Sequence, residues 1–130
     1  MKFLLDTTVF VDWANGLIPA RRLVDDLVAK TGDLSTCEAV TCEVLSGGTE
    51  EQRTAIDRLL AALEFVALDP EGARYAGQLR RDAGRSSGRT LGDALIAALA
   101  WRLEATIVTR NAADFTSFGV EVLEYGRSAP

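Results

Sequence analysis

The sequence contains no histidine, which removes the side chain that most often serves as a general base near neutral pH. Its two cysteines, Cys37 and Cys42, are too few for a disulfide scaffold, and without histidine they cannot complete a zinc site. We expect both to be buried or partly buried thiols in a reducing compartment, with a transient bridge between them as the alternative. Any metal chemistry must therefore rest on oxygen ligands.

Long apolar runs are also missing. After Met1 and Lys2 the first apolar run covers only residues 3–5 before Asp6, which is too short for a signal peptide. No stretch approaches the roughly 18 apolar residues that a membrane helix needs. The sequence therefore predicts a cytoplasmic protein that does not associate with membranes.

Positive charge is in short supply, since the formal net charge is −5 at pH 7. Taken alone, this argues against a sequence-independent nucleic-acid binder, because such proteins are normally basic. The argument weakens if the acids are concentrated in a metal pocket and the basic residues in a patch. Five arginines and a single acid, Asp82, occur between Arg74 and Arg89, which is consistent with such a patch.

A chain of 130 residues suits one compact domain, here residues 1–130. Short apolar segments alternate with helical patterns along the chain. This alternation predicts an α/β fold with right-handed crossovers and a mostly parallel central sheet of about five strands flanked by helices. The predicted strands cover residues 2–6, 33–37, 64–68, 105–109 and 120–123, and the predicted helices cover residues 7–15, 19–30, 38–46, 50–63, 70–83 and 91–103, with a loop or short helix over residues 111–118.

Four acidic residues fall where parallel sheets place their ligands, beyond the carboxyl ends of the strands. Asp6 ends the first predicted strand, and Asp114 follows the fourth. Asp93 lies in the first turn of a helix, and Glu43 lies in the middle of one. Taken singly, each has an ordinary explanation: a helix cap, a local turn, a favourable helix dipole or a solvated helix surface.

Two arguments favour a common role for these acids. The apolar neighbours Val40, Val44 and Leu45 predict that the helix carrying Glu43 is largely buried, where a carboxylate needs a partner. Several acids at one sheet edge would also repel one another unless a cation balanced them. Bound Mg²⁺ or Mn²⁺ would do so, and it could activate a water and stabilise charge on a phosphate. The sequence therefore predicts an acidic site for one or two metal ions formed by Asp6, Glu43, Asp93 and Asp114.

Four short motifs occur in order along nearly the whole chain. Residues 3–12 read FLLDTTVFVD, residues 40–47 read VTCEVLSG, residues 93–98 read DALIAA and residues 109–115 read TRNAADF. They resemble the LLDTSVLID, V-x-x-E-[LV]-L-x-G, DALIAA and TRN-x-x-DF motifs of the PIN-domain nucleases, and within that family the VapC-type toxins of bacterial toxin–antitoxin pairs. The departures are mild, since Thr8 replaces a commoner serine and keeps the hydroxyl.

The resemblance implies that the chain is an endoribonuclease toxin that hydrolyses phosphodiester bonds in structured cellular RNA, such as a tRNA, with Mg²⁺ or Mn²⁺. It also implies a homodimer and a cognate antitoxin whose extended tail covers the active site. The acidic quartet of the family matches Asp6, Glu43, Asp93 and Asp114. Polar positions near that quartet match Thr7, Thr109 and Asn111, for which we expect orienting roles.

Other surfaces suggest how partners bind. The segment that contains Arg85 and Arg89 shortly precedes Asp93 in the sequence. We therefore predict that these two arginines contact RNA phosphates, with an ordinary solvated loop as the alternative.

Aromatic and apolar side chains provide a second candidate surface. Phe10, Trp13 and Leu17 are a candidate groove for an apolar segment of the antitoxin, unless Phe10 and Trp13 belong to the core. Trp101 is predicted to lie in the core or in a dimer interface.

Two other functions compete with the ribonuclease prediction. An α/β phosphatase-like enzyme would use Asp6 as a nucleophile, but such proteins usually need a lysine after a late strand and often a second aspartate two residues on. Here that position is Thr8, and the only lysines are Lys2 and Lys30. A non-catalytic PIN-fold binding module is the other alternative, although the intact acidic quartet argues against it. Metal-dependent cleavage would distinguish the binding module from the ribonuclease.

Overall fold

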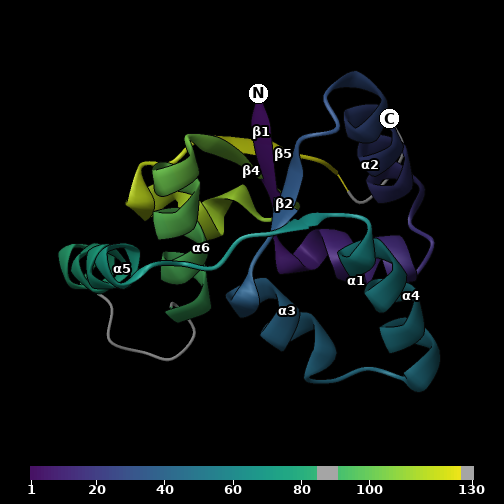
Figure 1. The fold of residues 1–130 in the computed structure, drawn as a ribbon, viewed down its shortest axis with the longest axis horizontal. Helices are drawn as coiled ribbons and strands as arrows, with labels where there is room; N and C mark the ends of the chain where they lie inside the picture. Colours follow the sequence, from purple (N-terminus) through teal and green to yellow (C-terminus); the bar gives the residue numbers. More distant parts are fainter. Residues whose placement is uncertain (85–90, 127–130) are drawn as a thin grey trace.

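The computed structural model describes residues 1–84 and 91–126, and a five-stranded parallel sheet lies at its centre (Figure 1). The strands lie in the order β3-β2-β1-β4-β5, and each pair of neighbours is parallel. The first strand in the chain is therefore the middle strand of the sheet. The strands are β1 (Lys2–Leu5), β2 (Leu34–Thr36), β3 (Glu64–Phe65), β4 (Ala105–Thr109) and β5 (Val122–Glu124).

Helices cover both sides of this sheet. Figure 1 shows α5 and α6 on one side of the strands and α1, α2 and α4 on the other. Local sequence sets several helix starts: Thr49 and Gln52 form a capping box before α4, and Asp69 accepts a hydrogen bond from the Gly72 amide at the start of α5. The helices are α1 (Thr7–Ala14), α2 (Ile18–Lys30), α3 (Glu38–Leu45), α4 (Glu50–Ala61), α5 (Pro70–Asp82), α6 (Leu91–Leu103) and the 3-10 helix η2 (Ala112–Phe118).

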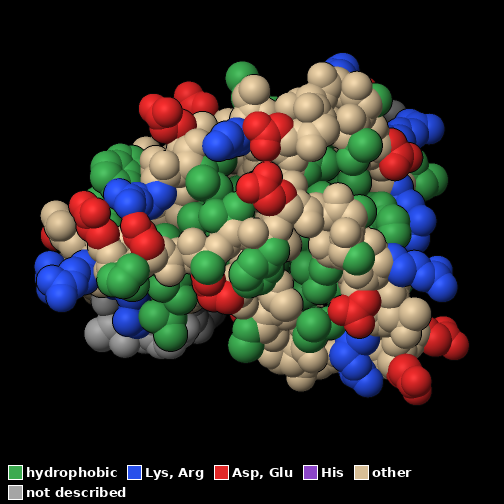
Figure 2. Space-filling model, in the orientation of Figure 1, with side chains coloured by type: hydrophobic (Ala, Val, Ile, Leu, Met, Phe, Trp, Pro, Cys, Tyr) green, Lys and Arg blue, Asp and Glu red, His purple; other side chains and the backbone are tan. Residues whose placement is uncertain are grey.

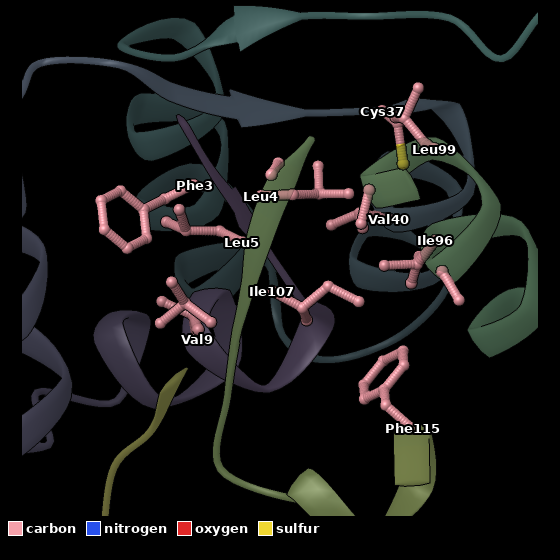
Figure 3. Close-up of a cluster of buried hydrophobic side chains, with 14 of the residues drawn as sticks. Phe3, Leu4, Leu5, Val9, Cys37, Val40, Ile96, Leu99, Ile107 and Phe115 are labelled. Atoms are coloured by element: carbon pink, nitrogen blue, oxygen red, sulfur yellow. The ribbon is translucent and has the colours of Figure 1, made fainter. Parts of the chain in front are cut away.

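The core is built from strand side chains that alternate between the two faces of the sheet (Figure 3). Leu4 points toward Val40 of α3, whereas Phe3 and Leu5 point to the opposite side, where Val9 of α1 lies. All five side chains are buried. Because β1 is covered on both faces beyond the exposed Lys2, its residues 3–5 are all apolar.

The predicted α/β fold is confirmed, and the helix over residues 91–103 and the strand over residues 105–109 have the predicted bounds. The third strand is shorter than the predicted residues 64–68. The amide of Leu68 leaves the ladder and donates to the carboxylate oxygens of Glu38 at 3.1 and 3.2 Å. The fifth strand begins at residue 122 rather than 120 because Gly119, with φ of 67°, ends η2 just before it.

Several side chains lie elsewhere than predicted. Phe10 is fully buried and belongs to the core, so it cannot line a surface groove. Trp13 and Leu17 are half-buried, and the guanidinium of Arg21 lies 4.4 Å from the centroid of the Trp13 ring. Trp101 is 53% exposed and is therefore not a core residue; its ring centroid lies 4.6 Å from that of Tyr75.

The two cysteines differ in their exposure to solvent. Cys37 is buried, but Cys42 is exposed, which corrects the expectation that both are at least partly buried; both are free thiols.

No helix among residues 1–84 and 91–126 has the length and apolar character needed to cross a membrane. On the face in Figure 2, charged side chains of both signs gather over α5 at one end and over α4 at the other.

Candidate functional site

The order of the sheet places a topological switch point between β1 and β4. From β1 the chain continues to β2 and β3 on one side, and it later returns to β4 and β5 on the other. Ligands of open parallel sheets bind beyond the strand ends at such a switch point. Asp6 directly follows β1 and Thr109 ends β4, so both lie at this switch point.

Asp6 is a buried carboxylate, only 3% exposed, and its contacts are not those of a helix cap. It occupies the N-cap position of α1, but its side chain makes no capping hydrogen bond. Its Oδ2 accepts a hydrogen bond from Thr109 Oγ1 at 2.8 Å, and its Oδ1 accepts one from Thr7 Oγ1 at 3.3 Å. Two of the three predicted orienting residues therefore contact Asp6 directly.

The hydroxyl protons around Asp6 have a defined direction. Asn111 donates its backbone amide to Thr109 Oγ1 at 3.1 Å, and Arg110 donates its amide to Thr8 Oγ1 at 3.0 Å. Thr8 Oγ1 and Thr109 Oγ1 lie 3.3 Å apart. A threonine hydroxyl has one proton, and that of Thr109 points to Asp6, so the Thr8 hydroxyl must donate to Thr109. The chain of donors ends on the Asp6 carboxylate.

Electrostatic effects connect Asp6 with two other predicted acids. Burial raises the pKa of Asp6 above its usual range; the hydrogen bond from Thr109 lowers this pKa, and the charge of Asp114 raises it. Partial desolvation raises the pKa of the Glu43 carboxyl although the residue is exposed overall, and the charge of Asp6 raises it further. The charge of Asp114 is therefore close enough to affect the ionisation of Asp6, and that of Asp6 to affect the ionisation of Glu43.

Glu43 of α3 lies beside the first turn of α6. The helix α3 buries Val40 and Val44 on one side only, so Glu43 is exposed, and the prediction of a largely buried carboxylate was wrong. Gly92 packs directly against it: a Cβ on Gly92 would lie 2.4 Å from Glu43 Oε1. A side chain at position 92 would therefore displace the Glu43 carboxylate, and the residue after Gly92 is Asp93.

The remaining predicted residues that the structure describes lie on α6 and on the segment after β4. Asp93 is half-buried in the first turn of α6. Asp114 is exposed in the first turn of η2, and its amide donates to the backbone oxygen of Asn111 at 3.0 Å. Asn111 itself is exposed. Arg85 and Arg89, predicted to bind RNA, lie outside the described residues.

These acids fit a hard divalent cation by their chemistry. All the donors are carboxylate oxygens, which Mg²⁺ and Mn²⁺ prefer, and their mutual repulsion is what a cation would relieve. Within the described part of the chain, however, no three Asp, Glu, Cys or His side chains are gathered closely enough to hold a metal ion. The structure thus brings the acids to one edge without closing them around a common point.

Comparison with known proteins identifies the family to which the chain belongs. A family model described as the PIN domain matches residues 3–119. The chain belongs to the PIN-domain family. Among its relatives, ribonuclease VapC19 of Mycobacterium tuberculosis is 32% identical over 117 residues, which cover 88% of this chain and 93% of VapC19. The predicted resemblance to PIN-domain nucleases of the VapC type is therefore confirmed.

Solved structures show the same PIN fold. VapBC2 from Rickettsia felis, bound to a DNA fragment from its promoter, superposes with a TM-score of 0.79 at 23% identity, and the match covers 96% of this chain and 99% of that one. A toxin–antitoxin complex from Klebsiella pneumoniae gives a TM-score of 0.74 at 24% identity, covering 94% and 96%.

Sequence reasoning missed one polar cluster of this PIN domain. Asp12 is buried, 6% exposed, and its two carboxylate oxygens accept hydrogen bonds from Arg110 Nη1 at 2.6 Å and from the Tyr125 hydroxyl at 2.7 Å. A signal was available, because the helical spacing of Asp12 from Val9 places it on the inward side of its helix. A buried aspartate at that position requires partners, although nothing local identifies them.

Proposed function

We propose that this PIN domain is a metal-dependent endoribonuclease toxin that is neutralised by a cognate antitoxin. The observation that carries the proposal is the buried Asp6 carboxylate at the switch point of the sheet, oriented by Thr109 and electrostatically opposed by Glu43 and Asp114. The name of VapC19 as a ribonuclease supports the same activity. Among the described residues no cationic side chain pairs with this buried acid, and an uncompensated buried carboxylate is costly, which supports a functional role at this position.

The residues that would hold Mg²⁺ or Mn²⁺ are Asp6, Glu43, Asp93 and Asp114. When bound, such a cation makes a water molecule more acidic and stabilises negative charge on a phosphate oxygen. The chain itself supplies orientation. Thr109 and Thr7 fix the Asp6 oxygens by donating to them, and the Asn111 amide keeps the Thr109 proton directed at Asp6.

The substrate we propose is structured cellular RNA, cut where bases and backbone are unpaired. A site beyond the ends of the strands, with a buried acid at its centre, is reached more easily by a single strand than by the backbone of a rigid A-form helix. Such a substrate places the working protein in the cytoplasm. The antitoxin proposal is supported by the toxin–antitoxin complex from Klebsiella pneumoniae, which shares this fold; we also propose that the toxin works as a homodimer.

The test is cleavage of total cellular RNA by purified, antitoxin-free protein with Mg²⁺, with Mn²⁺ or with EDTA. Asp6→Asn is compared with Asp25→Asn, which makes the same change on the exposed surface of α2. Cutting that EDTA and Asp6→Asn abolish, and that Asp25→Asn retains, supports the proposal, and fragment ends then identify the target. RNA binding without cutting under any condition would favour the non-catalytic binding module instead.

A further inference from the structure

Asp12 is not one of the four candidate metal ligands. Its buried carboxylate connects three parts of the chain that are distant in sequence. Its partners are Arg110, just after β4, and Tyr125, just after β5. The Asp12–Arg110 pair is mostly buried, with side chains that are 8% and 19% exposed. A pair desolvated to this degree is weak evidence for stability, since apolar residues of similar volume would often serve as well. Its retention therefore needs another reason.

The backbone around this cluster supplies that reason. Arg110 stands between Thr109, which donates to Asp6, and Asn111, whose amide donates to Thr109. The amide of Arg110 is itself held by Thr8 of α1, and the amide of Tyr125 donates to the backbone oxygen of Thr109 at 3.3 Å. Both partners of Asp12 therefore hold the residue that orients the Asp6 carboxylate.

We propose that Asp12, Arg110 and Tyr125 form a positioning unit that holds the end of β4 against α1 and thereby fixes the Thr109 hydroxyl on Asp6. The inference rests on the proposed function, because it assigns these residues to the same site. None of the three would touch substrate or metal; each acts through Thr109. Outer hydrogen bonds of this kind typically change metal affinity by about 10- to 100-fold when they are removed.

The experiment compares Tyr125→Phe and Asp12→Asn with Val24→Ala. Tyr125→Phe removes one hydroxyl and keeps the ring. We expect this milder variant to fold even where Asp12→Asn does not. Val24→Ala is the matched control, because Val24 is a buried residue of α2 whose side chain makes no hydrogen bond and whose truncation lowers stability. Mn²⁺ affinity is measured by calorimetry, and kcat and KM are measured on an RNA oligonucleotide that the wild type cuts.

We expect Tyr125→Phe to weaken Mn²⁺ binding and to lower kcat by about tenfold each, with an unchanged KM for RNA. Val24→Ala should leave all three quantities unchanged at temperatures well below its Tm. If the cluster variants change Mn²⁺ affinity and kcat no more than Val24→Ala does at an equal loss of Tm, the unit is merely structural and the proposal is wrong.

A second measurement separates this inference from the proposed function. Amide hydrogen exchange of Arg110 and Asn111 reports the geometry around Thr109 whether or not the protein cuts RNA. Tyr125→Phe should accelerate exchange at these two amides and Val24→Ala should not. Selective acceleration without any cleavage by the wild type would contradict the proposed function and leave the positioning unit intact, whereas unchanged exchange would overturn the positioning unit itself.

Discussion

The hydroxyl of Thr109 donates a hydrogen bond of 2.8 Å to Asp6, a residue 103 positions earlier in the chain. Both are buried, and each follows or ends one of the two adjacent strands at the switch point of the sheet. The bond fixes one oxygen of Asp6 and leaves the carboxylate without a cationic side chain among the partners described for it. This combination of orientation and uncompensated charge distinguishes a binding site from a structural ion pair.

The stability of the protein should respond to Asp6 in a direction that most carboxylates do not show. The pKa of Asp6 is raised in the folded state, mainly by burial, so the folded state binds this proton more tightly than the unfolded chain does. Its ionisation therefore removes stability as the pH rises from about 4 through the raised pKa. Asp6→Asn should have a higher Tm than the wild type at neutral pH, by about 4 °C for each kcal/mol of relieved charge burial.

This difference in Tm should shrink as the pH falls below about 4, where Asp6 is protonated in both states. Thermal unfolding followed by circular dichroism between acidic and neutral pH measures it, with Asp25→Asn as the reference. A variant Asp6→Asn that is less stable than the wild type at neutral pH would show that the buried charge is already compensated.

Gly92→Ala should impair cleavage while leaving the fold intact. The new Cβ would lie 2.4 Å from Glu43 Oε1 and 3.0 Å from its Cδ, so the flexible side chain of Glu43 must move away. Activity should fall about tenfold or more, since small displacements of site groups are costly. Gly77→Ala is the control: it makes the same change in α5, where a Cβ would have no neighbour within 4 Å.

Both alanine variants should keep or slightly raise the Tm, because alanine in a helix is more favourable than glycine by about 1 kcal/mol. RNA cleavage rates and Tm values of the two variants are compared in parallel. Equal activity in Gly92→Ala and Gly77→Ala would show that the position of Glu43 is not required for cutting.

The two thiols should differ in reactivity. Burial raises the pKa of the Cys37 thiol to about 11, whereas Cys42 is exposed. Because the thiolate is the reactive form, a disulfide reagent should modify one thiol in the native protein and two after denaturation. In Cys42→Ser the native protein should show no rapid reaction. Rapid modification of Cys37 in that variant would mean that β2 and α3 open readily, since Cys37 lies between them.

Replacement of Arg85 and Arg89 by glutamine should weaken RNA binding and flatten its salt dependence. If each arginine contacts one phosphate, the slope of log affinity against log salt should fall by about 1.4 for a single strand. Fluorescence anisotropy of an RNA oligonucleotide in the absence of metal measures this slope. Arg22→Gln combined with Arg58→Gln removes the same charge from exposed positions of α2 and α4. Equal slopes in the two double variants would leave only a non-specific charge effect.

The fold could be predicted because the local sequence determines most of its helices and strands. The helix over residues 91–103 and the strand over residues 105–109 are separated by a single residue, Glu104, and neither contains proline. The end of β3 could not be predicted, because it depends on the Glu38 side chain capturing the Leu68 amide from another element.

The candidate site shows the same division. The positions of Asp6 and Asp114 after strands, and that of Asp93 at a helix start, followed from the order of elements. The exposure of Glu43 and the pairing of Asp12 with Tyr125, 113 positions away, did not. Which side chain satisfies a buried group across that separation is decided by packing in three dimensions and has no local signature.

The position of β1 in the middle of the sheet has a consequence for how the protein is made. This strand is synthesised first, yet one of its two neighbours, β4, ends only at Thr109. A nascent chain emerges from the ribosome beginning at its N-terminus, so Asp6 is exposed long before Thr109 can orient it. Because the proposed ribonuclease activity depends on Asp6, we expect that fragments from synthesis interrupted before Thr109 do not cut the RNA of the cell that makes them.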